Sequence, residues 1–227
     1  MVVQHTVYYV LIITAIISVA LVFINKKLTS FNSLDKPKGI VLLMMMGVDA
    51  IEQMLLDQTN PEITKQLTPY FCSTFIYIFL ANISGLLAFE TPTSNLSVTV
   101  ALALITCILI EYYSIKYNGP KNYFKSLLEP FAPFLILNLL GKVSTLLSLS
   151  LRLFGNIIAG SVLMNVLYQM FAAISRFIPL IGNINIFGIA LAPFFHFYFD
   201  LFAGAMQAYI FTMLSISFIG KELPKED

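Results

Sequence analysis

The sequence predicts an all-α integral membrane protein. Of its 227 residues 58% are hydrophobic and only 11% are charged, and the mean hydropathy is +0.85, whereas soluble domains average about 25% charged residues. The apolar residues also gather in runs of the length that a membrane-crossing helix needs, about 20 residues. The net charge of +1 gives no reason to expect a nucleic-acid partner. We expect one membrane domain over 1–227, with five membrane-crossing segments and one interfacial amphipathic helix.

The first two apolar stretches differ in kind. No basic residue precedes the stretch 7–24 and no small-residue cleavage site follows it, so we expect a retained span rather than a signal peptide. The stretch 40–56 is short, and Asp49, Glu52 and Asp57 are set among its apolar residues. Such a pattern is typical of an amphipathic helix that lies at the membrane interface.

The next two stretches, 69–89 and 96–115, are predicted to form a helical hairpin around the loop that begins at Glu90. The last two, 131–174 and 183–219, would be about 65 Å and about 55 Å long as helices, against a hydrocarbon core of about 30 Å. We therefore expect two strongly tilted or kinked helices, with Pro193 as a kink, paired as an antiparallel hairpin.

The distribution of lysines predicts the orientation of the chain in the membrane. With five crossings, the ten loop and terminal lysines named below all fall on one side of the membrane, and the loops on the opposite side hold only Arg176. Because cytoplasmic loops are enriched in basic residues, we expect the N-terminus outside and the C-terminus in the cytoplasm. The lysines are Lys26, Lys27, Lys36, Lys38, Lys65, Lys116, Lys121, Lys125, Lys221 and Lys225.

Arg152 is the most informative residue. It lies in the apolar run LLSLSLRLFGNIIAGSVLMNVL, with no lysine, aspartate or glutamate within nine residues on either side. A permanently charged guanidinium at the centre of a membrane helix costs about 2.5–3.5 kcal/mol on insertion scales, which by default indicates a functional role. Ser148 and Asn156 share its helical face at steps of four, a stripe that equally fits a seam of small residues between helices.

The last apolar block places His196, Asp200 and Gln207 on one helical face. An aspartate one turn from a histidine suits a proton relay. The alternatives are a static salt bridge between Asp200 and Arg152, and a passive packing role for His196. Lys142 is expected either to extend toward the interface or to line a water-filled cavity. Cys72 and Cys107 are interpreted as small buried hydrophobic residues.

Several stretches, in order along the chain, closely resemble subunit a of F-type ATP synthases. The signature SLSLRLFGNIIAG at 148–160 is the most specific of them. The others are FLANISG at 79–85, TPTSNLSVTVALA at 91–103, YYSIK at 112–116 with Gly119, and QAYIFTML at 207–214. The resemblance implies a non-catalytic subunit without cofactor or metal, which lies against a rotating ring of c subunits and provides two aqueous half-channels.

The resemblance also implies roles for individual residues. Arg152 matches the essential arginine, Asn156 lies one turn later, and Gln207 lies on the facing helix. The family usually couples a residue at the position of Asp200 with one at the position of Ser161, and many members carry a glutamate at the outer channel where this chain has Asn138. The outer route is then expected to use Glu90 or His196, and Ser148, Ser161 and Asn138 are expected as further lining residues.

The resemblance implies as partners the c-ring, the peripheral-stalk b subunits, the rest of the F1Fo complex and membrane lipid, with no nucleic acid. Mitochondrial relatives usually have histidine at the position of Ser161, so a bacterial plasma membrane is favoured over a mitochondrial inner membrane. A competing interpretation of Arg152 is an ion-coupled secondary transporter, although such folds tend to show internal repeats, and none is visible here. A purely structural anchor would leave the arginine unexplained.

Overall fold

The computed structural model describes residues 2–29, 39–87, 91–129, 131, 133–176 and 185–223, which form helices and no strand. Two short 3-10 helices, η1 (Ser84–Leu87) and η2 (Pro92–Ser94), flank the turn after α3, and a π-helical turn, η3 (Phe197–Phe202), joins α7 to α8. The α-helices are α1 (Val2–Thr29), α2 (Ile40–Leu56), α3 (Pro61–Ile83), α4 (Leu96–Asn118), α5 (Pro120–Leu128), α6 (Phe134–Ser175), α7 (Ile186–His196) and α8 (Ala203–Glu222).

Four helical segments are long and apolar enough to cross a membrane: Pro61–Leu86, Leu96–Asn118, Phe134–Ser175 and Phe187–Glu222. The first helix contributes a shorter apolar stretch, Val10–Phe23. The all-helical membrane class is therefore confirmed, and the fifth crossing stays a prediction. Helix α2 has the bounds expected for the interfacial helix, and its position at an interface also stays a prediction.

The start of α3 and the segment after α4 differ from what was expected. Helix α3 begins at Pro61 rather than at residue 69, because Pro61 fits the first turn of a helix and the chain tolerates Pro69 inside it. The sequence analysis also missed α5. Gly119, with a φ of 77°, makes the reversal between α4 and α5 in a backbone region that favours glycine, and the short helix then leads into α6.

The long C-terminal hairpin forms as α6 followed by α7, η3 and α8, although most of its connecting loop (177–184) lies outside the described residues. Pro193 lies inside α7 and removes one helical hydrogen bond. The wider π turn begins four residues later, at Phe197, and π turns inside helices are frequent at functional sites. The regular helix is therefore interrupted where His196 and Asp200 lie.

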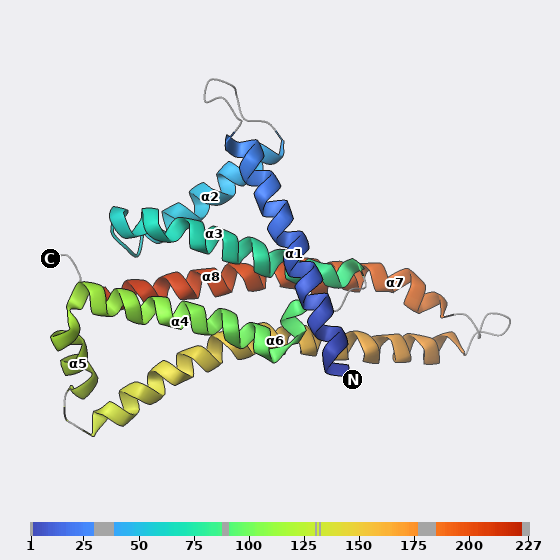
Figure 1. Cartoon of the computed structure of the whole chain (residues 1–227). Helices are drawn as coiled ribbons and strands as arrows, with labels where there is room; N and C mark the ends of the chain where they lie inside the picture. The colour runs from blue at the N-terminus through green and yellow to red at the C-terminus, as the bar shows by residue number, and fades with distance from the viewer. Residues whose placement is uncertain are drawn as a thin grey trace.

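Helices α3, α4 and α8 form the centre of the molecule, and α6 crosses α4 while α2 packs on α3 (Figure 1). One buried apolar cluster joins α2, α3, α4 and α8 around Phe71, and a second joins α3, α4, α6 and α8 around Phe211. Helix α6 is the least enclosed of the candidate spans, because only 11% of its most apolar window is buried, against 44% for the last span. One long face of α6 is therefore open.

Gly204 lets α8 approach α3 closely. A Cβ at this position would lie 2.9 Å from the Cβ of Asn82, whose side chain donates to Gly204 O at 3.3 Å and accepts from Thr93 Oγ1 at 2.8 Å. We expect Gly204→Ala to destabilise the protein in detergent by about 1–3 kcal/mol, measured as a lower midpoint of thermal unfolding. Gly141→Ala is the matched control, because its Cβ meets nothing within 4 Å; equal midpoints would contradict the close packing.

Candidate functional site

Arg152 lies in the middle of α6 and is half-buried. Its Nη2 donates a long hydrogen bond of 3.5 Å to Ser148 Oγ, and its buried Nη1 has no partner among the described residues. Leu149 and Leu153, on either side, are at most 1% exposed and pack in the cluster that contains Ala208 and Phe211 of α8. The guanidinium therefore lies beside well-packed leucines, and both N–H groups of its buried Nη1 lack a partner among the described residues.

Gln207 lies next to Ala208, which packs in the same cluster as Leu149 and Leu153. It is 6% exposed, and its Nε2 is buried without a partner among the described residues. Buried donors without a partner are costly and uncommon in folded proteins. Arg152 Nη1 and Gln207 Nε2 are thus buried donor atoms, one of them charged, whose hydrogen bonds an anionic acceptor would satisfy.

Asp200 does not serve as that acceptor. Its Oδ2 lies 2.7 Å from His196 Nδ1, one turn earlier, so the static salt bridge between Arg152 and Asp200, weighed from the sequence, is wrong. His196 Nε2 lies 2.9 Å from Tyr168 Oη on α6. The three side chains form a continuous hydrogen-bonded row in which the imidazole connects a phenol to a carboxylate. Asp200, at one end of this row, belongs to the π turn.

Tyr168 is a member that the sequence analysis missed. Its partner His196 lies 28 residues further along the chain and on another helix, a pairing that helical spacing does not reveal. A signal was present, because Tyr168 follows Ser161 and Asn165 at steps of four and three and so extends the polar face of α6.

The row borders a cavity of about 730 Å³, here called the His196 cavity. Helix α6 lines it from Asn156 to Tyr168, including Ser161, and Asn82 and Asn95 line it from the opposite side. Asp200 is also close to the 3-10 helix after α3, since a Cβ on Gly85 would lie 3.8 Å from its Cγ. The predicted residues Asn156, Ser161, His196 and Asp200 are thus brought to one polar cavity.

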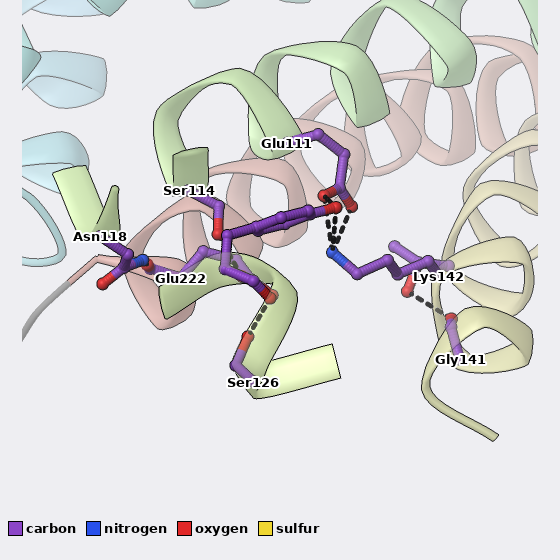
Figure 2. Close-up of polar contacts among 9 residues, drawn as sticks. Glu111, Ser114, Asn118, Ser126, Gly141, Lys142 and Glu222 are labelled. Carbon is purple, nitrogen blue, oxygen red and sulfur yellow. Dashed lines mark hydrogen bonds and ion pairs between the residues drawn. The ribbon is translucent and has the colours of Figure 1, made fainter. Parts of the chain in front are cut away.

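A second cavity, of about 650 Å³, lies toward the other end of α6 and is called the Lys142 cavity. Helix α6 lines it from Leu139 to Leu146, and Lys142 Nζ contacts both oxygens of Glu111 on α4, at 2.7 and 2.6 Å. Figure 2 shows this pair facing across the space between the two helices. A polar pocket of about 520 Å³ adjoins the cavity, because Lys221 and Glu222 line both.

Arg152 lies between the two cavities along α6. The Lys142 cavity ends at Leu146 and the His196 cavity begins at Asn156, so the residues from Leu147 to Gly155 line neither. Two separate hollows thus reach the helix from its two ends, with a fixed positive charge in the interval.

Two predicted lining residues, Ser148 and Asn138, line neither the His196 nor the Lys142 cavity. Asn138 does not line the His196 cavity as expected; its Nδ2 donates to the backbone oxygens of Leu127 at 2.9 Å and Glu129 at 3.4 Å, and so fastens the turn from α5 into α6. The helix separates Asn138 from Tyr168 by about 45 Å, so Asn138 belongs to the opposite end. Glu90 lies outside the described residues.

The chain is similar to known proteins over most of its length. Residues 7–220 match the family of the ATP synthase A chain. ATP synthase subunit a of Desulforamulus reducens is 34% identical over 158 residues, a match that spans 68% of this chain and 56% of the relative's own length. ATP synthase subunit a of Streptococcus agalactiae is 30% identical over 219 residues, which cover 92% of this chain and 88% of that protein. ATP synthase subunit a of Mycoplasma genitalium is 31% identical over 214 residues, 88% of this chain and 73% of that protein. The chain therefore belongs to the ATP synthase A chain family, that of subunit a of the F-type ATP synthase.

Proposed function

We propose that the chain conducts protons through two half-channels, which the His196 and Lys142 cavities form, and that Arg152 separates them. Subunit a belongs to the Fo sector, is itself non-catalytic and translocates protons. The observation that carries the assignment of these residues is the position of Arg152 in the interval of α6 that neither cavity reaches. Protons then pass between the half-channels only on the carboxyl groups of a rotating c-ring, which couples their flow to ATP synthesis or hydrolysis.

The arginine controls the protonation of the ring carboxyl group. That group must be neutral while it faces lipid, because an isolated charge there is costly, and it loses its proton beside a fixed cation, which favours the anion. The unpartnered donor atom Nη1 of Arg152 supports this role, since a carboxylate accepts charge-assisted hydrogen bonds from a guanidinium. A guanidinium keeps its own protons, so a proton cannot pass by hopping through it. Each charge that crosses supplies about 2.3 kcal/mol per 100 mV.

The row of Tyr168, His196 and Asp200 carries protons through the His196 cavity. A histidine ring can accept a proton at one nitrogen while it releases another from the second, and both nitrogens of His196 have a hydrogen-bond partner in the row. Tyr168 thereby supplies the second group of a relay at a site where Ser161 is neutral and only bonds Ile158 O on its own helix.

The c-ring is proposed to lie against the open face of α6. Leu151, Ile158, Val162 and Val166 are between 38% and 55% exposed on this helix, while the opposite face packs on the rest of the subunit through Leu149 and Leu153. An apolar face beside Arg152 suits the apolar helices of a ring. The remaining surface is left for lipid and for the peripheral-stalk b subunits.

The proposed arrangement in the membrane has five crossings in one domain, with α1 as the first and the α6 and α7–α8 hairpin strongly tilted. Lys116, Lys121, Lys125 and Lys221 lie around the α4–α5 turn and the end of α8, and Arg176 follows the far end of α6 (Figure 1). The lysine-rich end is the cytoplasmic one by the enrichment of basic residues there. The relatives are bacterial, which favours a bacterial plasma membrane.

Isolation of the complex tests the function. We expect c subunits to co-purify with the chain, and a cysteine at Val162 to form a cross-link with a cysteine on the ring's outer face. Val19→Cys on α1 is the matched control, because the two valines are 55% and 62% exposed, and Cys72 and Cys107 are first replaced with alanine. The absence of c subunits, or equal cross-linking at both positions, would contradict the proposal.

A further inference from the structure

Glu111, Tyr123 and Lys142 form a closed cluster that joins α4, α5 and α6. Besides its contacts with Glu111, Lys142 Nζ lies 3.3 Å from Tyr123 Oη and 4.7 Å from the centre of the tyrosine ring. Tyr123 Oη donates to Glu111 Oε2 at 2.5 Å. The ammonium group thus uses its three donors, and Figure 2 shows the ion pair at the centre of this contact.

A charged cluster is an unfavourable way to make a contact whose only role is to pack helices together. Both charges are partly removed from water, since the Lys142 and Glu111 side chains are 27% and 30% exposed, and apolar residues of similar volume often stabilise such a site as well or better. Burial, and next the Glu111 carboxylate, raise the pKa of the Tyr123 hydroxyl above its ordinary value, so the phenol stays a donor. The cavity around the pair is otherwise mostly apolar, with Leu104, Ile108, Leu139 and Leu146 in its walls.

The position of the cluster points to ion passage. The adjoining polar pocket reaches it through Glu222, which accepts from Ser114 Oγ at 2.8 Å. In the other direction Thr145 lines the same cavity, and Ser148 accepts from Arg152. Lys142, Thr145, Ser148 and Arg152 follow one another at steps of three, three and four, which keeps them on one side of α6.

The positive charge of Lys142 opposes the passage of protons along such a route. A positive charge at the entrance repels every proton that approaches Arg152, unless an anion cancels it. Glu111 is the anion that contacts it, and both of its oxygens lie within 2.7 Å of Nζ. We propose that the Glu111–Lys142–Tyr123 cluster is a charge-neutral polar site on the path of protons through the second half-channel, and that Glu111 is kept in the membrane to cancel the charge of Lys142.

The inference rests on the proposed function, and ATP-driven proton pumping by the assembled F1Fo complex in vesicles tests it. An uncompensated ammonium near the path slows proton passage by about tenfold at an effective dielectric constant of 20. We therefore expect Glu111→Gln to lower pumping about tenfold, and the double variant Glu111→Gln with Lys142→Met to recover to within about threefold of the wild type. Glu62→Gln is the control, because Glu62 is an exposed glutamate in the first turn of α3 and lines neither cavity nor the adjoining polar pocket.

Each outcome separates a conduction role from a structural one. Pumping is normalised to the amount of assembled complex and to the ATP hydrolysis measured after release of F1. A merely structural defect lowers pumping and these two quantities in parallel. Unchanged pumping in Glu111→Gln overturns the inference, and so does a double variant that assembles but stays as slow as the single one. If Glu111→Gln does not assemble, the neutral double variant carries the test alone, with near-normal pumping expected. Loss of pumping in Arg152→Ala, together with normal pumping in Glu111→Gln, rejects the role of the cluster and leaves the two half-channels supported.

Discussion

Replacing Arg152 with alanine is expected to abolish ATP-driven proton pumping while the F1 heads still hydrolyse ATP. Without the guanidinium a protonated ring carboxyl group passes from one cavity to the other without releasing its proton, so that rotation no longer moves protons. Charge is the decisive property, since the surrounding helix is already fixed by Leu149 and Leu153. Pumping is measured as acidification of vesicles that contain the complex, and hydrolysis as phosphate release from the same samples.

Arg176→Ala is the matched control, because Arg176 lies exposed at the far end of α6 and lines neither the His196 nor the Lys142 cavity. We expect it to pump at nearly the wild-type rate. Arg152→Lys should pump poorly, because a buried ammonium shifts its pKa readily and can release its proton. Normal coupled pumping by Arg152→Ala would refute the role assigned to the arginine.

The apolar runs predicted the helices well because burial in lipid acts on long stretches. The bounds of α2 agree with the expected 40–56, and α6 and the last block differ from 131–174 and 183–219 by a few residues at each end. The elements that the sequence analysis missed, α5 and the π turn, depend on local backbone geometry. Gly119 reverses the chain through a positive φ, and hydropathy does not register such a turn.

The candidate site was predictable on single helices and less so between them. Helical spacing placed His196 and Asp200 together, and the structure confirms their contact. Tyr168 and Tyr123 were missed because their partners come from other helices. Glu111 was also missed, although a charge inside an apolar helix needs a partner at this position as much as at Arg152. Its partner is Lys142, the residue whose role the sequence left open.

The row of Tyr168, His196 and Asp200 gives the second large expected effect. Asp200→Asn removes the carboxylate that His196 Nδ1 contacts at 2.7 Å and leaves the side-chain shape unchanged. We expect pumping to fall about a hundredfold, the lower range of what a positioned proton-transfer group contributes. Tyr168→Phe should give a smaller loss, because it removes one end of the row and keeps the histidine–aspartate contact.

The measurement is the rate of proton pumping across a range of pH, normalised to the amount of assembled complex. Asp49→Asn is the matched control, since Asp49 is an exposed aspartate on α2 and lines neither cavity. A relay makes the rate depend on pH through its own protonation, so loss of the relay changes the shape of the profile as well as its height. A structural role for Asp200 predicts less assembled complex with an unaltered profile. An unchanged rate at every pH would mean that protons cross the His196 cavity without this row.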